Sequence, residues 1–262
     1  MRTITAYSNP LVKQVRDLRD KRHRRESGRF LAEGLRILIE AREGGRLPVL
    51  VFLAEASAAH PLVRTLIAEV EAAGGEAIAT TPDILAKLSG KDNPQAVVGV
   101  FDAWDTPLDA LDRTASDIWL VAERLRDPGN LGTILRTGDA VGAGGLILIG
   151  ECVDPFSVEA VRASMGALFT VPVVRSEWAP FLAWLRGGPG QLVGLSLDGG
   201  DYRAAQYAAP TFLLTGNEAQ GMPADYAAAC DLLVKMPMLG KADSLNAAVA
   251  TAVMAYEVLG RT

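Results

Sequence analysis

The sequence predicts an α/β protein built from two domains, the second of which holds a parallel β-sheet. Short apolar runs alternate with amphipathic segments along the chain, as in proteins made of strand and helix units. In the second half these runs are apolar at nearly every position, which is typical of parallel strands covered on both faces. The acidic, proline-containing stretch 102–117 indicates a linker, so we expect domains at 1–101 and 118–262.

The first domain is expected to be a small α/β unit that opens with a basic helix. Ser8, Asn9 and Pro10 form a helix start, in which a capping side chain precedes proline in the first turn. Gly28 ends this helix. The polar loop 87–94 is suited to a surface contact. Strands are expected at 29–32, 49–53, 77–80 and 96–101, and further helices at 33–43, 62–72 and 82–88.

The second domain is expected to place three polar clusters at one edge of its sheet. The clusters are Asn130 with Arg136, residues 216–218, and Ser244 with Asn246. Each follows an apolar strand, and ligands of parallel sheets bind at the carboxyl ends of strands. Strands are expected at 118–122, 146–149, 171–174, 192–195, 211–214 and 232–234, with helices at 131–141, 158–163, 179–185 and in the last third of the domain.

Charge is distributed unevenly along the chain. The net charge is −5, but residues 1–46 hold twelve Lys and Arg against six Asp and Glu, a net of +6. A basic arm on an acidic body is common in chains that bind polyanions, although a solvated charged helix would show the same composition. The arginines proposed to contact RNA phosphates are Arg16, Arg19, Arg22, Arg24 and Arg25.

Several function classes are excluded by what the sequence lacks. No run of 18 apolar residues and no signal peptide is present, so we expect no membrane span and a cytoplasmic protein. Cys152 and Cys230 lack metal-ligand spacing, and His23 and His60 are isolated, so we expect free thiols and no metal. The glycine-rich run 142–145 precedes a strand and lacks the G-x-G-x-x-G spacing, which disfavours a nicotinamide or flavin site.

Three segments of the second domain resemble the motifs of the SpoU family, the RNA 2′-O-ribose methyltransferases of the SPOUT superfamily. They are DPGNLGTILRTGDAVGAGGLIL (127–148), FLLTGNEAQGM (212–222) and VKMPMLGKADSLNAAVATAVMAYE (234–257). They occur in the family order and at family-like spacing. The stretches RFLAEGLRILIEA and LSGKDNPQAVVGVF resemble the ribosomal-protein-like substrate-binding domain that precedes many SpoU catalytic domains.

The resemblance implies S-adenosylmethionine as methyl donor, a homodimer, and a deep trefoil knot in the last third of the chain. It also implies an RNA substrate, and the separate basic domain favours ribosomal RNA over tRNA. By position, the implied catalytic set is Asn130, Arg136, Glu218, Ser244 and Asn246, and the implied donor-binding set is Thr215, Gly216, Met236, Met238, Ser244 and Leu245.

Several roles stay open at this point. Arg136 could act as a base or grip a phosphate, and its high pKa favours the grip. Asn130 could simply cap its helix, and Glu218 could be a turn residue. Met236 replaces the usual Ile, and Ala248 stands where the family usually has Ser. The missing hydroxyl leaves, as an alternative function, a catalytically inactive RNA- or ribosome-binding protein on the same fold.

The C-terminal helix is apolar almost all round, so its faces must be assigned by residue size. We expect the small residues Ala247, Thr251 and Ala255, at four-residue steps, to let a partner helix approach closely in the dimer. The larger residues are expected to pack inside the domain. They are Leu245, Val249, Val253, Tyr256 and Leu259.

Overall fold

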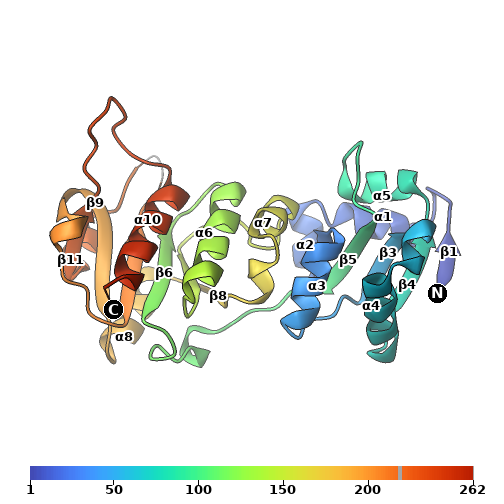
Figure 1. Cartoon of the computed structure of the whole chain (residues 1–262), viewed down its shortest axis with the longest axis horizontal. Helices are drawn as coiled ribbons and strands as arrows, with labels where there is room; N and C mark the ends of the chain where they lie inside the picture. The colour runs from blue at the N-terminus through green and yellow to red at the C-terminus, as the bar shows by residue number, and fades with distance from the viewer. Residues whose placement is uncertain (218–219, 262) are drawn as a thin grey trace. The chain divides into compact units, whose positions relative to one another are not determined.

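The structure is a computed structural model that describes residues 1–217 and 220–261. The chain divides into two compact units (Figure 1). Unit 1 comprises Met1–Trp104 and Phe156–Thr170, and unit 2 comprises Asp105–Pro155 and Val171–Thr262. The α/β fold class expected from the alternation of apolar runs is confirmed in both units.

Unit 1 is built on a mixed five-stranded sheet in the order β1-β4-β3-β5-β2. Strand β5 runs antiparallel to both β2 and β3, whereas β1, β3 and β4 are mutually parallel. The expected strands are confirmed, and β1 is an addition too short to give a periodic pattern. The strands are β1 (Arg2–Ile4), β2 (Arg29–Glu33), β3 (Leu50–Ala54), β4 (Glu76–Thr80) and β5 (Val97–Asp102).

The basic N-terminal segment forms two helices, so the prediction of one continuous helix is wrong. The carboxylate of Asp20 accepts a hydrogen bond from the Arg22 N–H at 2.7 Å and starts a second helix. Gly28, in a left-handed conformation, ends that helix as expected. The helices of this unit are α1 (Pro10–Asp17), α2 (Lys21–Ser27), α3 (Leu35–Glu43), α4 (Pro61–Ala72), α5 (Pro82–Ser89) and α7 (Val158–Ser164).

Segment 156–170 packs with unit 1, although in the sequence it lies between two strands that belong to unit 2. Phe156 lies 4.7 Å from Phe30 between ring centroids, and Phe169 lies 4.9 Å from Phe101. Trp104 completes this aromatic cluster, at 4.9 Å from Phe156. Because aromatic rings bury large apolar areas, these contacts explain why the segment packs with unit 1 and not with the unit that holds its sequence neighbours.

Unit 2 contains a six-stranded sheet in the order β11-β9-β10-β6-β7-β8. Every neighbouring pair is parallel, which confirms the prediction from the continuous apolar runs. The strands are β6 (Ile118–Glu123), β7 (Leu146–Ile149), β8 (Val173–Ser176), β9 (Gln191–Asp201), β10 (Thr211–Thr215) and β11 (Leu232–Lys235).

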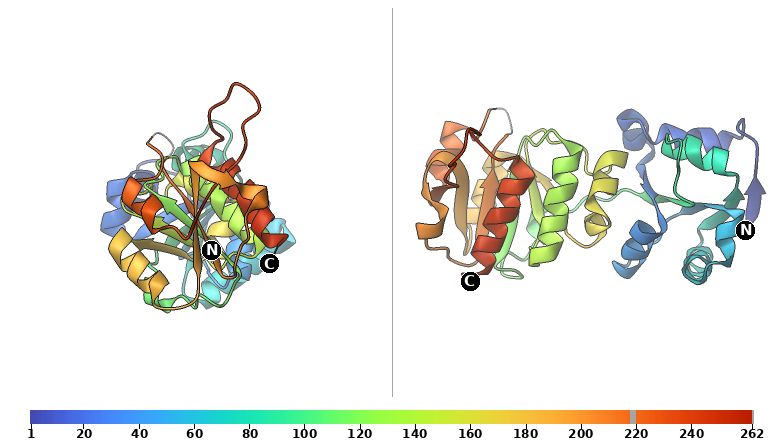
Figure 2. Two further views of the ribbon diagram at one scale, coloured as in Figure 1. Left: turned by 90° about the vertical axis from the view of Figure 1, so that its left-hand side faces the viewer. Right: turned by 45° about the horizontal axis from the view of Figure 1, so that its top comes forward.

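Helices cover both faces of this sheet. Helices α6 (Pro128–Val141) and α10 (Ala247–Leu259) lie side by side on one face, and α8 (Trp178–Arg186) and α9 (Ala224–Ala229) lie on the other (Figure 2, left). The trefoil knot that the family resemblance implies stays a prediction.

The two sides of α10 are used in the opposite way from the prediction. Ala247, Thr251 and Ala255 are buried, at 7, 1 and 0 % exposure, and the helix packs on α6 of the same chain. The small side chains therefore admit α6, not a helix of another molecule. The larger side chains that we expected to pack inside the domain are instead exposed. Leu245, Val249, Val253, Tyr256 and Leu259 are 37–56 % exposed.

Candidate functional site

A cavity of about 1110 Å³ lies in unit 2, beside residues 195–198 of β9 and the carboxyl ends of β10 and β11. The loop 236–246, which joins β11 to α10, forms one wall and projects from the body of this unit (Figure 1). The predicted site residues that line the cavity are Asn130, Thr215, Gly216, Met236, Met238, Ser244, Leu245 and Asn246.

Two asparagines connect the first and third motifs at this cavity. Asn246 Nδ2 donates a hydrogen bond to Asn130 Oδ1 at 2.8 Å, although the residues are 116 positions apart. Asn246 also starts α10, because its Oδ1 accepts from the Ala248 N–H at 2.9 Å. Asn130 does not cap α6; that position belongs to Asp127, whose carboxylate accepts the Asn130 N–H at 2.7 Å. The cap interpretation of Asn130 is therefore wrong.

Strand β10 brings the second motif to the same cavity. The hydroxyl oxygens of Thr215 and Thr251 lie 2.7 Å apart, and both side chains are buried, which ties the end of β10 to α10. Gly216 follows, and a Cβ at this position would meet the Met222 nitrogen at 2.6 Å. The chain therefore turns back on itself so closely that only glycine fits.

Arg136 does not line the cavity. Its side chain is exposed on α6 and makes no hydrogen bond or ion pair with any of the residues 1–217 and 220–261. Its neighbours Thr133 and Thr137 donate to backbone carbonyls of α6 at 2.9 and 3.0 Å, so they add no free hydroxyl. Glu218, predicted as part of the catalytic set, lies outside the described residues.

Sequence reasoning missed a buried carboxylate beside this site. Glu123, at the carboxyl end of β6, is 2 % exposed and forms an ion pair with Arg124. Its Oε2 accepts the Asn217 N–H at 3.2 Å, and the Arg124 carbonyl accepts from Asn217 Nδ2 at 2.9 Å. The only sequence signal was an acidic residue at the end of an apolar strand.

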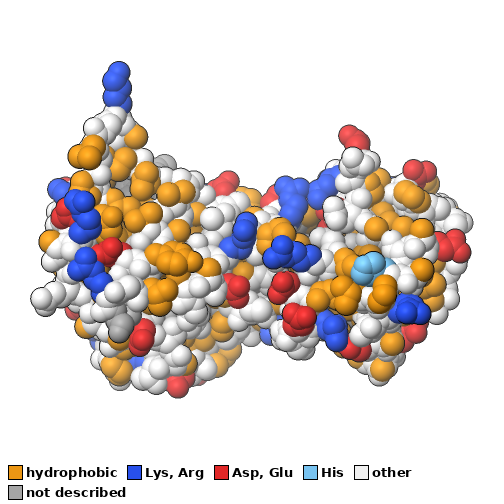
Figure 3. Space-filling model, viewed as in Figure 1, with side chains coloured by type: hydrophobic (Ala, Val, Ile, Leu, Met, Phe, Trp, Pro, Cys, Tyr) orange, Lys and Arg blue, Asp and Glu red, His pale blue; other side chains and the backbone are white. Residues whose placement is uncertain are grey.

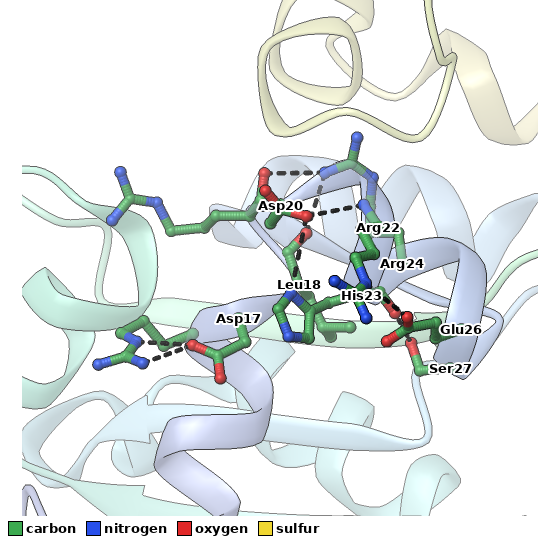
Figure 4. Close-up of polar contacts among 10 residues, drawn as sticks. Asp17, Leu18, Asp20, Arg22, His23, Arg24, Glu26 and Ser27 are labelled. Carbon is green, nitrogen blue, oxygen red and sulfur yellow. Dashed lines mark hydrogen bonds and ion pairs between the residues drawn. The ribbon is translucent and has the colours of Figure 1, made fainter.

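The basic segment of unit 1 is partly committed to internal contacts (Figure 4). Arg24 is 7 % exposed, and its Nη1 donates to the carbonyls of Leu18 and Arg19 at 3.0 and 2.9 Å. Burial therefore makes Arg24 a link between α1 and α2 and speaks against the predicted phosphate contact. Arg16 pairs with the adjacent Asp17 at 2.9 Å from its Nε, and remains partly exposed.

The other cations of this segment remain at the surface. Arg22 is 81 % exposed at its side chain and pairs with Glu26 at 2.7 Å. The Arg19 guanidinium lies against Gly90 of the polar loop that follows α5, since a Cβ there would meet its Cζ at 2.1 Å. Figure 3 shows Lys and Arg side chains gathered on the face that carries α2.

The two cysteines are free thiols with raised pKa values. Burial raises the pKa of Cys152 and of Cys230 to about 11.

Within residues 1–217 and 220–261, no three His, Cys, Asp or Glu side chains are grouped as metal ligands would be. No helix in that same part of the chain has the length and apolarity that a membrane crossing requires.

Comparison with known proteins assigns both units to described families. Residues 117–256 match the SpoU rRNA methylase family, and residues 9–99 match the MRM3-like substrate-binding domain. A 23S rRNA (uridine(2479)-2′-O)-methyltransferase of Streptomyces viridochromogenes is 34 % identical over 92 % of this chain and 86 % of its own. The 23S rRNA (guanosine(2553)-2′-O)-methyltransferase RlmP of Bacillus subtilis is 28 % identical over 99 % of this chain and 100 % of its own.

Solved structures agree over nearly the whole chain. The AdoMet-bound rRNA methyltransferase from Sinorhizobium meliloti superimposes with a TM-score of 0.91 at 39 % identity, covering 98 % of this chain and 96 % of that one. The SpoU methyltransferase AviRb of S. viridochromogenes, in complex with AdoMet, gives 0.86 at 32 %, covering 96 and 97 %. Since the SpoU model spans more than half of the chain, this protein belongs to the SpoU family of RNA 2′-O-methyltransferases and carries an MRM3-like substrate-binding domain.

Proposed function

We propose that this protein transfers a methyl group from S-adenosylmethionine to a ribose 2′-hydroxyl of 23S ribosomal RNA. The observation that carries the proposal is the Asn246–Asn130 hydrogen bond, which joins the first and third SpoU motifs at one cavity. Near full-length relatives at 28–39 % identity are 23S rRNA or rRNA methyltransferases by name, which supports the same substrate class.

The competing hypothesis is an inactive RNA-binding protein, for which the Ala248 departure was the sequence argument. Ala248 is 1 % exposed and does not line the cavity. A hydroxyl at this position would face the interior of the unit, so its absence removes nothing from the site. Asn130, Ser244 and Asn246 all line the cavity, which favours the enzyme.

The cavity suits the methyl donor. Gly216 lets the chain turn tightly, and the stretch 236–245 supplies an opposite wall, with Met236, Met238 and Leu245 among its lining residues. These residues would hold S-adenosylmethionine largely through backbone groups. When bound, the donor supplies an already activated methyl group on a sulfonium, so the protein must orient the 2′-oxygen and accept a proton.

Arg136 would orient the acceptor. An exposed guanidinium that pairs with no side chain among residues 1–217 and 220–261 can grip the phosphate next to the target ribose through two parallel hydrogen bonds. Deprotonating arginine is costly because its pKa lies above about 12, so the phosphate or Glu218 would receive the 2′-hydroxyl proton. Ser244 and Asn246 lie at the cavity wall, from which they would contact the ribose.

Substitution of Arg136 tests this role. We expect Arg136→Ala to abolish methyl transfer while donor affinity remains unchanged, and Arg136→Lys to keep a small part of the activity, because lysine holds phosphate as a point charge. Arg162, an exposed arginine on α7, provides the control Arg162→Ala. Full activity of Arg136→Lys would contradict the bidentate grip.

The surface cations of unit 1 would bind the RNA backbone. The proposed contacts are Arg16, Arg19, Arg22 and Arg25, without Arg24. Replacing one contact arginine by alanine should weaken RNA binding at every sequence and reduce the slope of log K against log salt by about 1. Arg24→Ala should instead lower the melting temperature, because it leaves two carbonyls without their donor.

We further propose a homodimer formed through the exposed face of α10. Val249, Val253 and Tyr256 are 47, 37 and 56 % exposed, and Figure 3 shows apolar side chains along the face that carries α10. Exposed apolar patches commonly mark protein interfaces. Light scattering should give a dimer for the native chain and a monomer for Val253→Lys, whereas the control Leu62→Lys on α4 should stay dimeric. A monomeric native chain at micromolar concentration would refute this interface.

Transfer of labelled methyl groups tests the function as a whole. The purified protein is incubated with labelled S-adenosylmethionine and either 23S rRNA or tRNA from a strain that lacks the gene. We expect labelling of 23S rRNA at one ribose. Donor binding by calorimetry without transfer to either RNA would favour the inactive RNA-binding protein, and labelling of tRNA alone would exclude the rRNA assignment.

A further inference from the structure

Glu123 has no role in the proposed reaction, yet it is a buried carboxylate beside the site. It lies at the carboxyl end of β6, in the middle of the six-stranded sheet, and its side chain is 2 % exposed. It does not line the cavity. Burying a carboxylate is costly unless it is paired and hydrogen-bonded, so its partners indicate what it stabilises.

The partners of Glu123 converge on one residue of the second motif. Glu123 Oε2 accepts the backbone N–H of Asn217 at 3.2 Å, and the carbonyl of the next residue, Arg124, accepts from Asn217 Nδ2 at 2.9 Å. Glu123 Oε1 is held by the Arg124 guanidinium. Backbone and side chain of Asn217 are thus both fixed to the end of β6, 94 and 93 positions earlier in the chain.

The backbone of Arg124 is shaped for this contact. Its φ angle is +42°, a left-handed conformation that residues other than glycine rarely adopt. Such a conformation persists where surrounding contacts enforce it, often near functional sites. Here it accompanies both the ion pair with Glu123 and the hydrogen bond that the Arg124 carbonyl accepts from Asn217.

Asn217 also holds two residues that follow it, Gln220 and Gly221. Its Oδ1 accepts the Gln220 N–H at 3.0 Å, and its carbonyl accepts the Gly221 N–H at 2.9 Å. Gly216, Asn217, Gln220 and Gly221 all line the cavity. A change at Glu123 therefore reaches the cavity wall through Asn217.

We propose that Glu123, together with Arg124, is a positioning element that holds Gly216, Asn217, Gln220 and Gly221 in the arrangement that binds the methyl donor. The inference rests on the proposed donor site. Without the carboxylate, Asn217 loses a charged acceptor, and these four residues sample conformations in which the donor contacts are not formed. The loss falls on donor affinity, whereas turnover at saturating donor is retained.

Calorimetry with S-adenosylmethionine tests the proposal on full-length variants. We expect Glu123→Ala to weaken donor binding about 10- to 100-fold, the range for a buried N–H that loses a charged acceptor. Asn217→Ala keeps that N–H but removes the side-chain hydrogen bonds to the Arg124 carbonyl and the Gln220 N–H, so we expect it to weaken donor binding about 10-fold. Glu123→Gln should recover most of the affinity, because its amide oxygen still accepts the Asn217 N–H. The double variant Glu123→Ala/Asn217→Ala should lose less binding free energy than the sum of the two single variants, since both substitutions release the same residue from the end of β6. The control is Glu151→Ala, an exposed carboxylate after β7.

Two further readouts separate positioning from general stability. Hydrogen exchange in a peptide covering 212–222 should accelerate in Glu123→Ala without donor, while peptides from α6 and β7 keep their protection. In steady-state kinetics, KM for the donor should rise while kcat changes by less than about threefold. If Glu123→Ala fails to fold, Asn217→Ala, at a partly exposed position, tests the Arg124 part of the element, because it removes the hydrogen bond to the Arg124 carbonyl.

Gly216→Ala distinguishes failure of this inference from failure of the donor site. If Gly216→Ala weakens donor binding but Glu123→Ala and Asn217→Ala stay within twofold of the native chain, the positioning role is refuted and the site stands. If Gly216→Ala also binds normally, the proposed donor site itself is wrong. Equal loss of affinity in Glu123→Gln and Glu123→Ala would also refute the role assigned to the accepted N–H.

Discussion

Substitution of Thr251 by valine probes how the strand that carries the second motif is fixed to α10. The Thr215 and Thr251 hydroxyls lie 2.7 Å apart, and the Thr251 hydroxyl also donates to the Ala247 carbonyl at 2.8 Å. A hydroxyl has one hydrogen, and Thr251 donates its hydrogen to the Ala247 carbonyl. Thr215 must therefore donate to the Thr251 oxygen. Valine keeps the shape and leaves the Thr215 hydrogen without an acceptor.

The expected magnitude follows from burial. Thr215 and Thr251 are 6 and 1 % exposed, so water does not replace the lost partner freely. An unsatisfied buried donor costs about 1–3 kcal/mol. For a unit of this size, each kcal/mol lowers the melting temperature by about 2–4 °C, which gives a loss of about 2–12 °C for Thr251→Val.

Thermal and urea denaturation, followed by circular dichroism, measure this loss. The double variant Thr215→Val/Thr251→Val replaces both partners, so it should be more stable than Thr251→Val alone. Thr133→Val is the control, because the exposed Thr133 hydroxyl donates to the Gly129 carbonyl of its own helix, and it should stay within about 0.5 kcal/mol of the native chain. A double variant that loses the sum of the two single effects would refute the reasoning.

Three other predictions concern residues of unit 2. Gly199→Ala should destabilise the edge of the sheet and weaken donor binding, because its Cβ would meet the Val234 nitrogen at 2.5 Å; unchanged urea stability would contradict this. Although burial acts to raise the pKa of Asp231, hydrogen bonds from Arg186 and the Leu192 N–H lower it below 3.8. The stabilisation from Asp231 is therefore present above pH 3.8 and is lost as the pH falls through the lowered pKa. Asp231→Asn should be less stable than the native chain at pH 7, and the difference in stability should shrink in acid. A difference in urea midpoints that does not change with pH would contradict this prediction. Cys152 and Cys230, with pKa values of about 11, should react slowly with iodoacetamide at pH 8 in the native protein and quickly in urea, as mass spectrometry would record; rapid native labelling would contradict their burial.

Unit 1 shows which structural features can be predicted from local sequence patterns. Apolar strands and capping signals such as Pro10 and Gly28 were visible in the sequence because they depend on neighbouring residues. The second N-terminal helix was missed, since the start signal at Asp20 lies inside a run of charged residues that continues the helical composition. The burial of Arg24 was also missed, because its acceptors are backbone carbonyls that have no sequence signature.

The candidate site divides in the same way. The three motifs identified most of the cavity lining, since each motif is a local stretch at the end of an apolar strand. The contribution of Glu123 could not be predicted. Its partner Asn217 is 94 positions away, and only the pairing of β6 with β10 brings them together.

The sequence by itself determined the class of this protein: parallel apolar strands, a basic first domain, and three polar motifs that end strands. Tertiary structure alone decided which side of α10 faces inward, because a helix that is apolar all round has no periodic signal to select a face. It likewise decided that Asn246 meets Asn130 and that Glu123 holds Asn217. Such contacts join residues about a hundred positions apart, and their geometry comes from the order of strands in the sheet, which no local pattern encodes.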